Sequence, residues 1–283
     1  MNTRMKKLQR AILACLLFAL YSSGSVLASI TATPKFLFLD GTKKSTPIQI
    51  ANVGAEEREV WIEVKFGYVV SDDSGKISLF MDSLDTEGLS AVPWIQIFPQ
   101  RFVLAAGENQ TIRLTASVPA SVKEGEYWAR VLVTSKPRKP PASSKPNQTQ
   151  PNSGLVLRTQ LGLPFHYRAG RVLTGVQIAD FNSSIEGSDL NVKFRLIRTG
   201  NASYWGTRTL RIIDQTGKIL YTRSKNAAVY KSLNVLEPLT LSEMPRGSYK
   251  IELELATGKR TDIRKDDLLP SPVVRSSIPL VIE

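Results

Sequence analysis

Cysteine and histidine are almost absent from this chain of 283 residues, which holds one of each, Cys15 and His166. Residues 29–283 therefore contain no cysteine, so they form no disulfide and offer no thiol nucleophile. A lone histidine on a strand is usually a hydrogen-bonded or surface side chain. No Gly-x-Ser-x-Gly elbow and no phosphate-binding glycine loop is present. We therefore predict no enzymatic activity, no metal and no cofactor.

The chain also lacks a long hydrophobic run. Its most apolar stretch, residues 11–20, is only ten residues long and follows four basic residues. In the segment Val26-Leu27-Ala28, Val26 and Ala28 then place small side chains at the −3 and −1 positions of a cleavage site. This layout predicts a secretory signal peptide over residues 1–28, cleaved after Ala28, and a periplasmic protein. Cys15 lies inside the apolar run and not after it, which argues against a lipid anchor. No later run reaches the length of a membrane span.

Acidic residues are the scarcer charge, with 25 against 37 basic residues and a formal net charge of +12. The four basic residues of the predicted signal peptide account for part of this surplus. The remaining basic residues are scattered and are not interleaved with aromatic side chains, so no nucleic-acid partner is indicated. We interpret them mainly as a solvated surface; the functional alternative is a preference for acidic partners or an anionic membrane surface.

Short runs of Val, Ile, Thr and aromatic residues recur along the chain, divided by Gly, Asn, Asp and Pro. Such runs predict strands. They cover residues 35–39, 46–51, 60–66, 94–98, 102–104, 111–116, 127–134, 155–167, 172–178, 189–197, 207–213, 218–223, 249–256 and 276–282. The pattern predicts an all-β protein with two immunoglobulin-like β-sandwich domains in tandem, over 29–168 and 169–283. Two polar stretches, Asp72–Gly75 and Asp214–Gly217, should be hairpin turns; the first lacks the ligand spacing of a calcium loop.

The two halves share one local pattern. Gly125-Glu126-Tyr127 opens an alternating run after Pro119, and Gly247-Ser248-Tyr249 opens another after Pro245. A tyrosine at the start of a late strand is the position of the tyrosine corner in immunoglobulin-like sandwiches. The repetition therefore supports the same fold in both halves.

A predicted flexible loop, residues 136–154, precedes the most distinctive strand. The loop holds five prolines and four basic residues but no large aliphatic side chain, so it cannot bury enough apolar surface to become ordered. Apolar residues then alternate along the strand at residues 155–168. A strand that follows a mobile loop is typically an edge strand, and an exposed apolar edge pairs readily with another chain.

Several segments together resemble the periplasmic chaperones of chaperone–usher pilus assembly. They are PKFLFLDGTKKSTPIQIANVG near the start, then PWIQIFPQRFVLAAGENQTIRL, PASVKEGEYWARVLV and, after the loop, LGLPFHYR. The resemblance covers residues 30–169; the second half matches only in being β-rich and of suitable size. It implies a protein that binds pilin-like subunits by donating the edge strand 155–168 and passes them to an outer-membrane usher. The side chains expected to enter the subunit are Leu155, Leu157, Leu161 and Leu163.

One feature of the resembling family is not found here. Its members hold the subunit's terminal carboxylate with an arginine on the first strand and a lysine on the last. The corresponding positions are Phe36 and either Gly162 or Pro164. Lys35 and Arg168 are the nearest cations able to bind a carboxylate and are the candidate anchor. The alternative is a secreted adhesive or structural protein with two immunoglobulin-like modules and no strand donation.

Overall fold

The computed structural model describes residues 29–82, 85, 87–138, 157–241 and 244–282. The predicted signal peptide with its cleavage site, most of the predicted loop and Leu155 lie outside the described residues. The described chain is built from strands and two short 3-10 turns, η1 (Val92–Trp94) and η2 (Lys265–Asp267). The prediction of an all-β protein made of two β-sandwiches is confirmed. The exact domain limits, 29–168 and 169–283, stay a prediction.

The first sandwich consists of two sheets. One has the order β1 (Ile30–Thr33), β3 (Ser45–Asn52), β8 (Asn109–Ala116), β6 (Ile95–Phe98). The other has the order β2 (Leu37–Asp40), β10 (Thr159–Ala169), β9 (Gly125–Pro137), β4 (Arg58–Ser71), β5 (Ile77–Asp82), and β7 (Arg101–Leu104) also pairs with β4. Side chains alternate in burial along β3 and β8, as expected for sheets with one face in a core. β9 continues to Pro137, so the predicted loop begins later than residue 136.

The second sandwich has a three-stranded and a four-stranded sheet. The first has the order β11 (Val176–Glu186), β12 (Asp189–Arg198), β15 (Ser232–Thr240). The second has the order β14 (Ile219–Val229), β13 (Tyr204–Asp214), β16 (Gly247–Ala256), β17 (Val274–Ile282). Each sandwich has its own apolar core, and the buried members of the two cores lie within residues 30–169 and 176–280. Burial of these side chains is the main force that stabilises each sandwich.

Both sandwiches contain the predicted tyrosine corner. The hydroxyl of Tyr127 donates to the carbonyl oxygen of Lys123 at 2.9 Å, and that of Tyr249 donates to the carbonyl oxygen of Pro245 at 2.6 Å. In each case the acceptor lies four residues before the tyrosine, at the corner that leads into the strand. The repeated Gly-x-Tyr pattern is therefore the same hydrogen-bonded corner used twice.

The two predicted hairpin turns are also confirmed, and they share one design. Oδ1 of Asp72 accepts hydrogen bonds from the backbone N–H and hydroxyl of Ser74 and from the N–H of Lys76. Oδ1 of Asp214 accepts the equivalent three bonds from Thr216 and Lys218. A glycine with φ near +80° follows in each turn, a conformation that other residues adopt with strain. These hydrogen bonds hold the pKa of both aspartates below the usual range.

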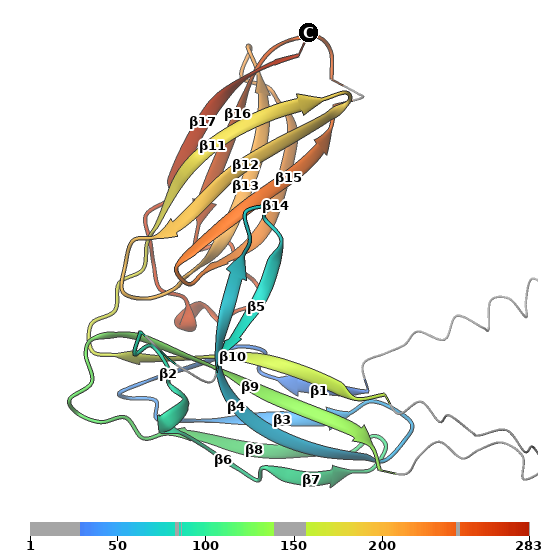
Figure 1. Ribbon diagram of the computed structural model, residues 1–283, viewed down its shortest axis with the longest axis vertical. Coiled ribbons are helices and arrows are strands. Elements are labelled where there is room, and N and C mark those ends of the chain that lie inside the picture. The colour runs from blue at the N-terminus through green and yellow to red at the C-terminus, as the bar shows by residue number, and fades with distance from the viewer. Residues whose placement is uncertain (1–28, 83–84, 86, 139–156, 242–243, 283) are drawn as a thin grey trace, which may run out of the picture.

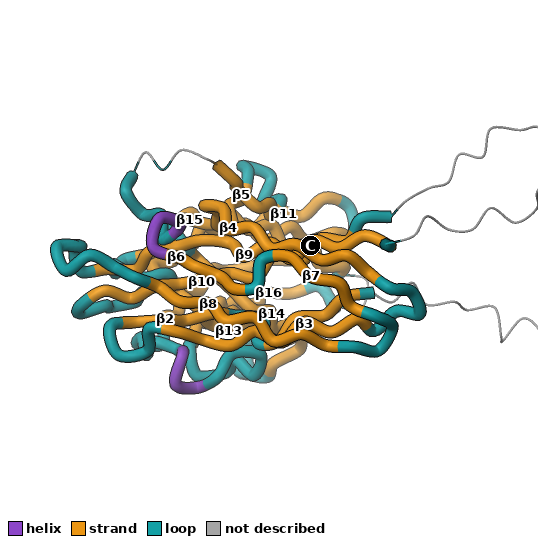
Figure 2. The backbone as a smooth tube through the Cα atoms, turned by 90° about the horizontal axis from the view of Figure 1, so that it is seen from below, coloured by secondary structure: helices purple, strands orange, loops and turns teal. Residues whose placement is uncertain are grey.

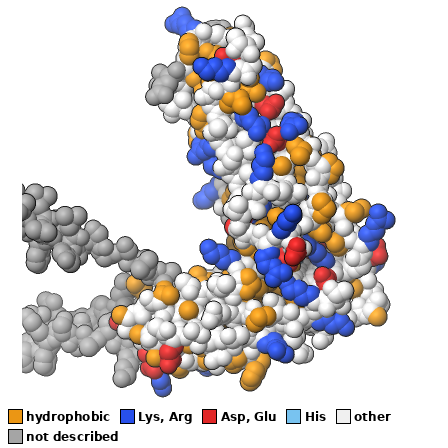
Figure 3. Space-filling model, turned by 180° about the vertical axis from the view of Figure 1, so that it is seen from behind, with side chains coloured by type: hydrophobic (Ala, Val, Ile, Leu, Met, Phe, Trp, Pro, Cys, Tyr) orange, Lys and Arg blue, Asp and Glu red, His pale blue; other side chains and the backbone are white. Residues whose placement is uncertain are grey.

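The sandwiches meet at an angle, and the hairpin formed by β4 and β5 extends from the first sandwich along the second (Figure 1). At the hairpin's tip the hydroxyl of Ser71 accepts a hydrogen bond from the backbone N–H of Asn234 at 2.6 Å. Val69 packs against the second core. Lysine and arginine side chains gather where the sandwiches join (Figure 3). Within the described residues, no helix is long and apolar enough to cross a membrane.

Candidate partner-binding strand and interdomain cluster

Strand β10 is paired along its whole length on one side only. Its residues from Thr159 to Ala169 pair antiparallel with β9, whereas β2 pairs with it in parallel only from Phe165 to Arg168. Among the described residues, no strand pairs with Thr159–Pro164 on the second side; we call this segment the β10 open edge. Pro164 suits such a position because proline has no N–H to donate. The open edge therefore presents backbone groups that another chain can pair with.

The predicted leucines lie on one face of this strand, and their exposure rises toward its start. Leu163 is only 6% exposed and belongs to the core, Leu161 is partly buried against it, and Leu157 is 61% exposed. Leu163 is therefore a core residue of its own sandwich, which differs from the role expected from the sequence. The physical reason is that both functions demand an apolar side chain at the same two-residue spacing, so periodicity alone does not separate them.

The start of β10 is held by cations on an aromatic ring. The guanidinium carbon of Arg158 lies 5.2 Å from the centre of the Trp61 ring, and Nζ of Lys136 lies 6.0 Å from it. Arg58 donates to the carbonyl oxygen of Leu157 at 3.4 Å. These contacts place residues 157 and 158 alongside β4 and β9, in line with the open edge.

A polar network centred on Glu126 joins the two sandwiches. Oε1 of Glu126 lies 3.0 Å from Nδ1 of His166 and also accepts hydrogen bonds from the backbone N–H and hydroxyl of Ser203, just before β13 of the second sandwich. Oε2 accepts from Nε of Arg168 at 3.1 Å. Burial alone would raise the pKa of Glu126, but the contact with His166, the charge of Arg168 and the Ser203 hydroxyl hold it well below its usual range.

The network continues through His166 into the second sandwich. The hydroxyl of Tyr230 lies 3.2 Å from Nε2 of His166, and Arg130 donates to the Tyr230 oxygen at 3.3 Å. Burial lowers the pKa of His166 and raises that of Tyr230. A neutral imidazole with Nδ1–H donating to Glu126 and Nε2 accepting from Tyr230 satisfies both partners. The single histidine is thus a buried link between domains, and sequence reasoning gave no sign of its partners.

Aromatic side chains surround this network and form the interdomain cluster. Its buried members are Phe38, Phe66, Tyr68, Trp128, Trp205, Tyr230 and Ile263. Phe36, where the resembling family has an arginine, packs edge-on against Trp205 with ring centres 5.4 Å apart. The junction is therefore a small apolar core between the sandwiches, with the Glu126 network inside it.

The two predicted carboxylate anchors have different partners. Arg168 binds Glu126, and its guanidinium carbon lies 4.5 Å from the centre of the Phe38 ring. Lys35 borders a recess between the sandwiches, near Asp262. Further cations of the junction were missed from the sequence, among them Arg130 and Arg198. Arg130 is buried and its Nε has no hydrogen-bond partner among the described residues, and Arg198 lies over the Trp128 ring at 5.4 Å.

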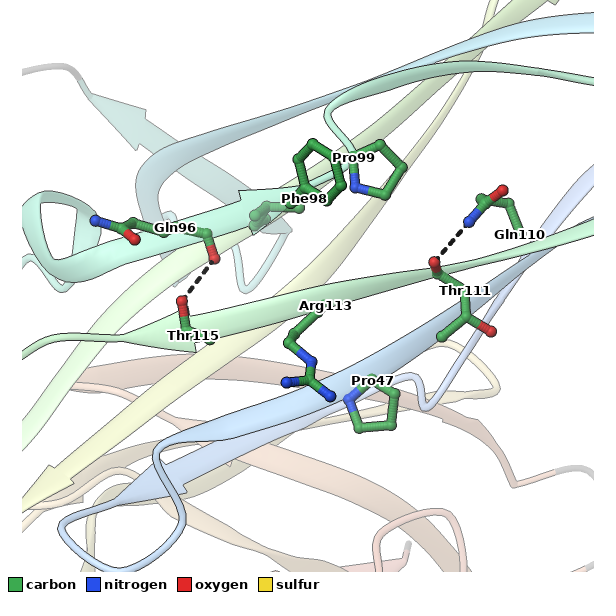
Figure 4. A pocket seen from close by; sticks show the side chains of 9 residues that line it. Pro47, Gln96, Phe98, Pro99, Gln110, Thr111, Arg113 and Thr115 are labelled. Carbon is green, nitrogen blue, oxygen red and sulfur yellow. Dashed lines mark hydrogen bonds between the residues drawn. The ribbon is translucent and has the colours of Figure 1, made fainter.

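A second surface lies on the other sheet of the first sandwich. Phe98 is 79% exposed at the rim of a recess of about 570 Å³, beside Pro99, Pro47 and Arg113 (Figure 4). Polar side chains complete the rim, among them Gln96 and three residues of β8: Gln110, Thr111 and Thr115. A large exposed aromatic ring with a polar surround is typical of a protein–protein contact. Among the described residues, no cluster of His, Cys, Asp or Glu could hold a metal ion.

No family model matches the sequence, and no curated protein matches it. Solved structures do show likeness. A YadV chaperone is 13% identical, with 89% of this chain and all of that chain covered, at a TM-score of 0.44. The CsuC–CsuE chaperone–tip adhesion subunit complex of Acinetobacter baumannii is 13% identical, with 88% of this chain and 98% of that chain covered, at a TM-score of 0.45. The structure of the Salmonella enterica SafA pilin in complex with the SafB chaperone is 12% identical, with 90% of this chain and 99% of that chain covered, at a TM-score of 0.41. Identities and TM-scores this low carry no argument about function.

Proposed function

We propose that this protein is a periplasmic chaperone that binds and stabilises pilus or fimbrial subunits by donating the β10 open edge. One observation carries the proposal: half of β10 has no pairing strand on its second side among the described residues, and toward that half the leucines become progressively more exposed. An open edge with large apolar side chains is the form of a strand that completes the sheet of another protein. We assign the protein no catalytic role.

The donated strand would act through its backbone and through alternate side chains. A subunit that lacks one strand exposes a row of unpaired backbone groups and an apolar groove, both unfavourable in water. The open edge would pair with that row, and Leu161, Leu157 and Leu155 would fill the groove. Each leucine that becomes fully buried contributes about 1.5–3 kcal/mol before ordering costs. Leu163 is left out of the donor set because its own core already buries it.

The charges at the junction favour a partner with a free carboxylate. Glu126 pairs with Arg168 and interacts with the charge of Arg198. Glu87 also interacts with Arg198 and is paired with Lys231, and Arg130 lies near His166. A neutral His166 does not change this balance, so guanidinium groups outnumber carboxylates around Glu126. A chain-terminal carboxylate of the subunit would balance the surplus. We propose Arg168 and Lys35 as the anchor, with the buried Arg130, whose Nε has no hydrogen-bond partner among the described residues, as a third candidate.

The Phe98 surface is a candidate site for the outer-membrane usher. It lies on the sheet opposite to the one that contains β10, so a protein bound there would leave the open edge accessible to a subunit. An assembly chaperone needs two such separate surfaces to hand over its cargo. Phe98→Ala should then reduce usher binding without reducing subunit binding.

Export to the periplasm is part of the proposal and depends on residues 1–28. The mature protein should begin at Ser29 and be recovered from the periplasmic fraction. N-terminal sequencing of the purified protein tests this; a retained Met1 or a lipid on Cys15 would contradict it.

The decisive experiment is co-purification of a small subunit from periplasm in a one-to-one complex. Leu155→Asp, Leu157→Asp and Leu161→Asp should each reduce capture by at least about tenfold, because a carboxylate forced into an apolar groove is desolvated without a counter-charge. Val281→Asp, at a similarly exposed position of the second sandwich, is the matched control and should bind normally. Thermal melts establish that each variant is folded.

Normal capture by folded leucine variants would rule out strand donation. The protein would then be the alternative, a secreted adhesive or structural protein with two immunoglobulin-like modules. The packing of Phe36 against Trp205, in place of the expected arginine, is the observation that favours this alternative. Lys35→Ala and Arg168→Ala separate the two further, since they should weaken subunit binding only if these cations hold a carboxylate.

A further inference from the structure

Strand β5 forms the outer edge of the sheet that contains β10. It pairs with β4 from Ile77 to Asp82, and no other described strand pairs with it. Ile77, Leu79 and Phe80 are 52%, 44% and 37% exposed. Figure 2 shows β5 at the periphery of the molecule. Three exposed large apolar side chains on one short edge strand form a surface suited to pairing with another strand.

The other edge strands of the described chain carry features that discourage such pairing. β14 has Arg223 and Lys225, β17 has Pro279, and β15 has Pro238. β11 has an irregular register at Asp180, whose φ is positive. The remaining edges, β1, β2, β6 and β7, are only four residues long. β5 has no proline, no bulge and no charge before its last residue, so it lacks these protections.

The backbone of β5 shows which groups face outward. The N–H of Asp72 donates to the carbonyl oxygen of Lys76 at 3.1 Å, which makes these residues a hydrogen-bonded pair at the hairpin end. Hydrogen-bonded and non-hydrogen-bonded pairs alternate along an antiparallel ladder. Ile77, Leu79 and Met81 therefore occupy non-hydrogen-bonded positions opposite β4. Their N–H and C=O groups point away from β4, toward the open side.

We propose that β5 pairs antiparallel with β5 of a second copy of this chain, about a two-fold axis at Leu79. In this register Leu79 faces the second copy's Leu79, and Ile77 faces the second copy's Met81, so all the outward backbone groups find partners. Lys76 faces the second copy's Asp82 at both ends of the ladder, which places opposite charges across the contact. The strand is thus self-complementary in backbone, apolar side chains and charge, as a two-fold contact requires.

The dimer does not depend on the proposed strand donation. β9 and β4 lie between β10 and β5 in the sheet, and β5 pairs with β4 beyond the part of β4 that pairs with β9. The two edges are therefore at least about 14 Å apart at the usual strand spacing. Each copy in the dimer would keep its β10 open edge.

Sedimentation velocity of the purified protein over a dilution series tests the proposal. A contact of this size should be weak, with dimer visible at about 100 µM and dissociated at about 1 µM. Leu79→Lys places like charges at the axis and should weaken association at least about tenfold. Ile219→Lys, on β14 and equally exposed as Ile77, is the control and should dimerise as the wild type does. Thermal melts show that both variants are folded.

A wild-type protein that stays monomeric at every concentration would overturn the proposal. So would a dimer that Leu79→Lys leaves intact. If that dimer were lost instead in Leu157→Asp, the second copy would be bound at the β10 open edge. Subunit capture by Leu79→Lys should be unchanged, so failure here and failure of the proposed function are distinguishable.

Discussion

The hydroxyl of Tyr230 in the second sandwich lies 3.2 Å from Nε2 of His166 in the first. Both side chains are buried, and Nδ1 of the same imidazole contacts Glu126. The imidazole of His166 therefore connects an acceptor in its own sandwich, Glu126, to a donor in the other sandwich, Tyr230. The relative placement of the sandwiches depends on a hydrogen bond as well as on apolar packing.

Tyr230→Phe should lower the free energy of unfolding by about 1–3 kcal/mol, because it leaves Nε2 of His166 buried without a donor. The ring and its apolar contacts remain, so the loss reports the hydroxyl alone. Urea unfolding measures it. Tyr221→Phe, at a partly exposed tyrosine of the same sandwich, should change stability by less than about 0.5 kcal/mol. Equal effects in the two variants would mean that the interdomain hydrogen bond contributes nothing.

Stability should fall as the pH is lowered from about 7 to 5. Burial depresses the pKa of His166, so the unfolded chain takes up a proton near the usual value of about 6.5 while the folded chain does not. Acid therefore favours the unfolded state in this range. Glu126, whose pKa is also depressed, adds stability that is present above its ordinary value of 4.5 and is lost below it.

The variant His166→Gln separates these two contributions. It should lose the decline between about pH 7 and 5 and keep the decline at lower pH, because glutamine does not titrate. Chemical unfolding at a series of pH values gives both slopes. An unchanged slope between pH 7 and 5 in the variant would assign the decline to other groups.

The two tyrosine corners should differ in their importance. The hydroxyl of Tyr127 donates from a buried side chain, and its hydrogen bond is partly buried, so water replaces it less well in Tyr127→Phe, which should cost about 1–1.5 kcal/mol. The hydrogen bond of Tyr249 is exposed, and water can replace the lost hydroxyl in Tyr249→Phe, which should cost less than about 1 kcal/mol. Thermal unfolding of both variants compares them. A larger loss in Tyr249→Phe would contradict the burial argument.

Two leucines on the same face of one segment should differ in how much their truncation to alanine lowers the stability. Leu163→Ala creates a cavity in the first core and should cost about 2–5 kcal/mol. Leu157→Ala removes an exposed side chain and should change stability by less than about 0.5 kcal/mol. Calorimetry distinguishes them. Comparable losses would show that Leu157 belongs to the core and would withdraw it from the donor strand.

Local patterns in the sequence predicted local structure well. The period of two along residues 155–167 predicted β10, and the repeated Gly-x-Tyr predicted both corners, because each depends on neighbours within a few residues. The Glu126 network was not predictable in this way. Its members are far apart in the chain, with Ser203 77 residues beyond Glu126, and only the packing of one sandwich on the other brings them together. Leu163 is buried and Leu157 is exposed although both fit the same alternation, because periodicity does not encode which positions the opposing sheet covers.

The pairing of β2 with β10 has a consequence for biosynthesis. Residues 37–40 pair in parallel with residues 165–168, so the strand that leaves the ribosome among the first is joined by the last strand of its sandwich. A nascent chain that stops before β10 has no place to seat Leu37 and Leu39, both fully buried in the finished fold. Their apolar side chains therefore stay in contact with water or with another protein until more than a hundred further residues have been synthesised. The first sandwich is therefore exposed to misfolding through its earliest segment for longer than its compact final form suggests.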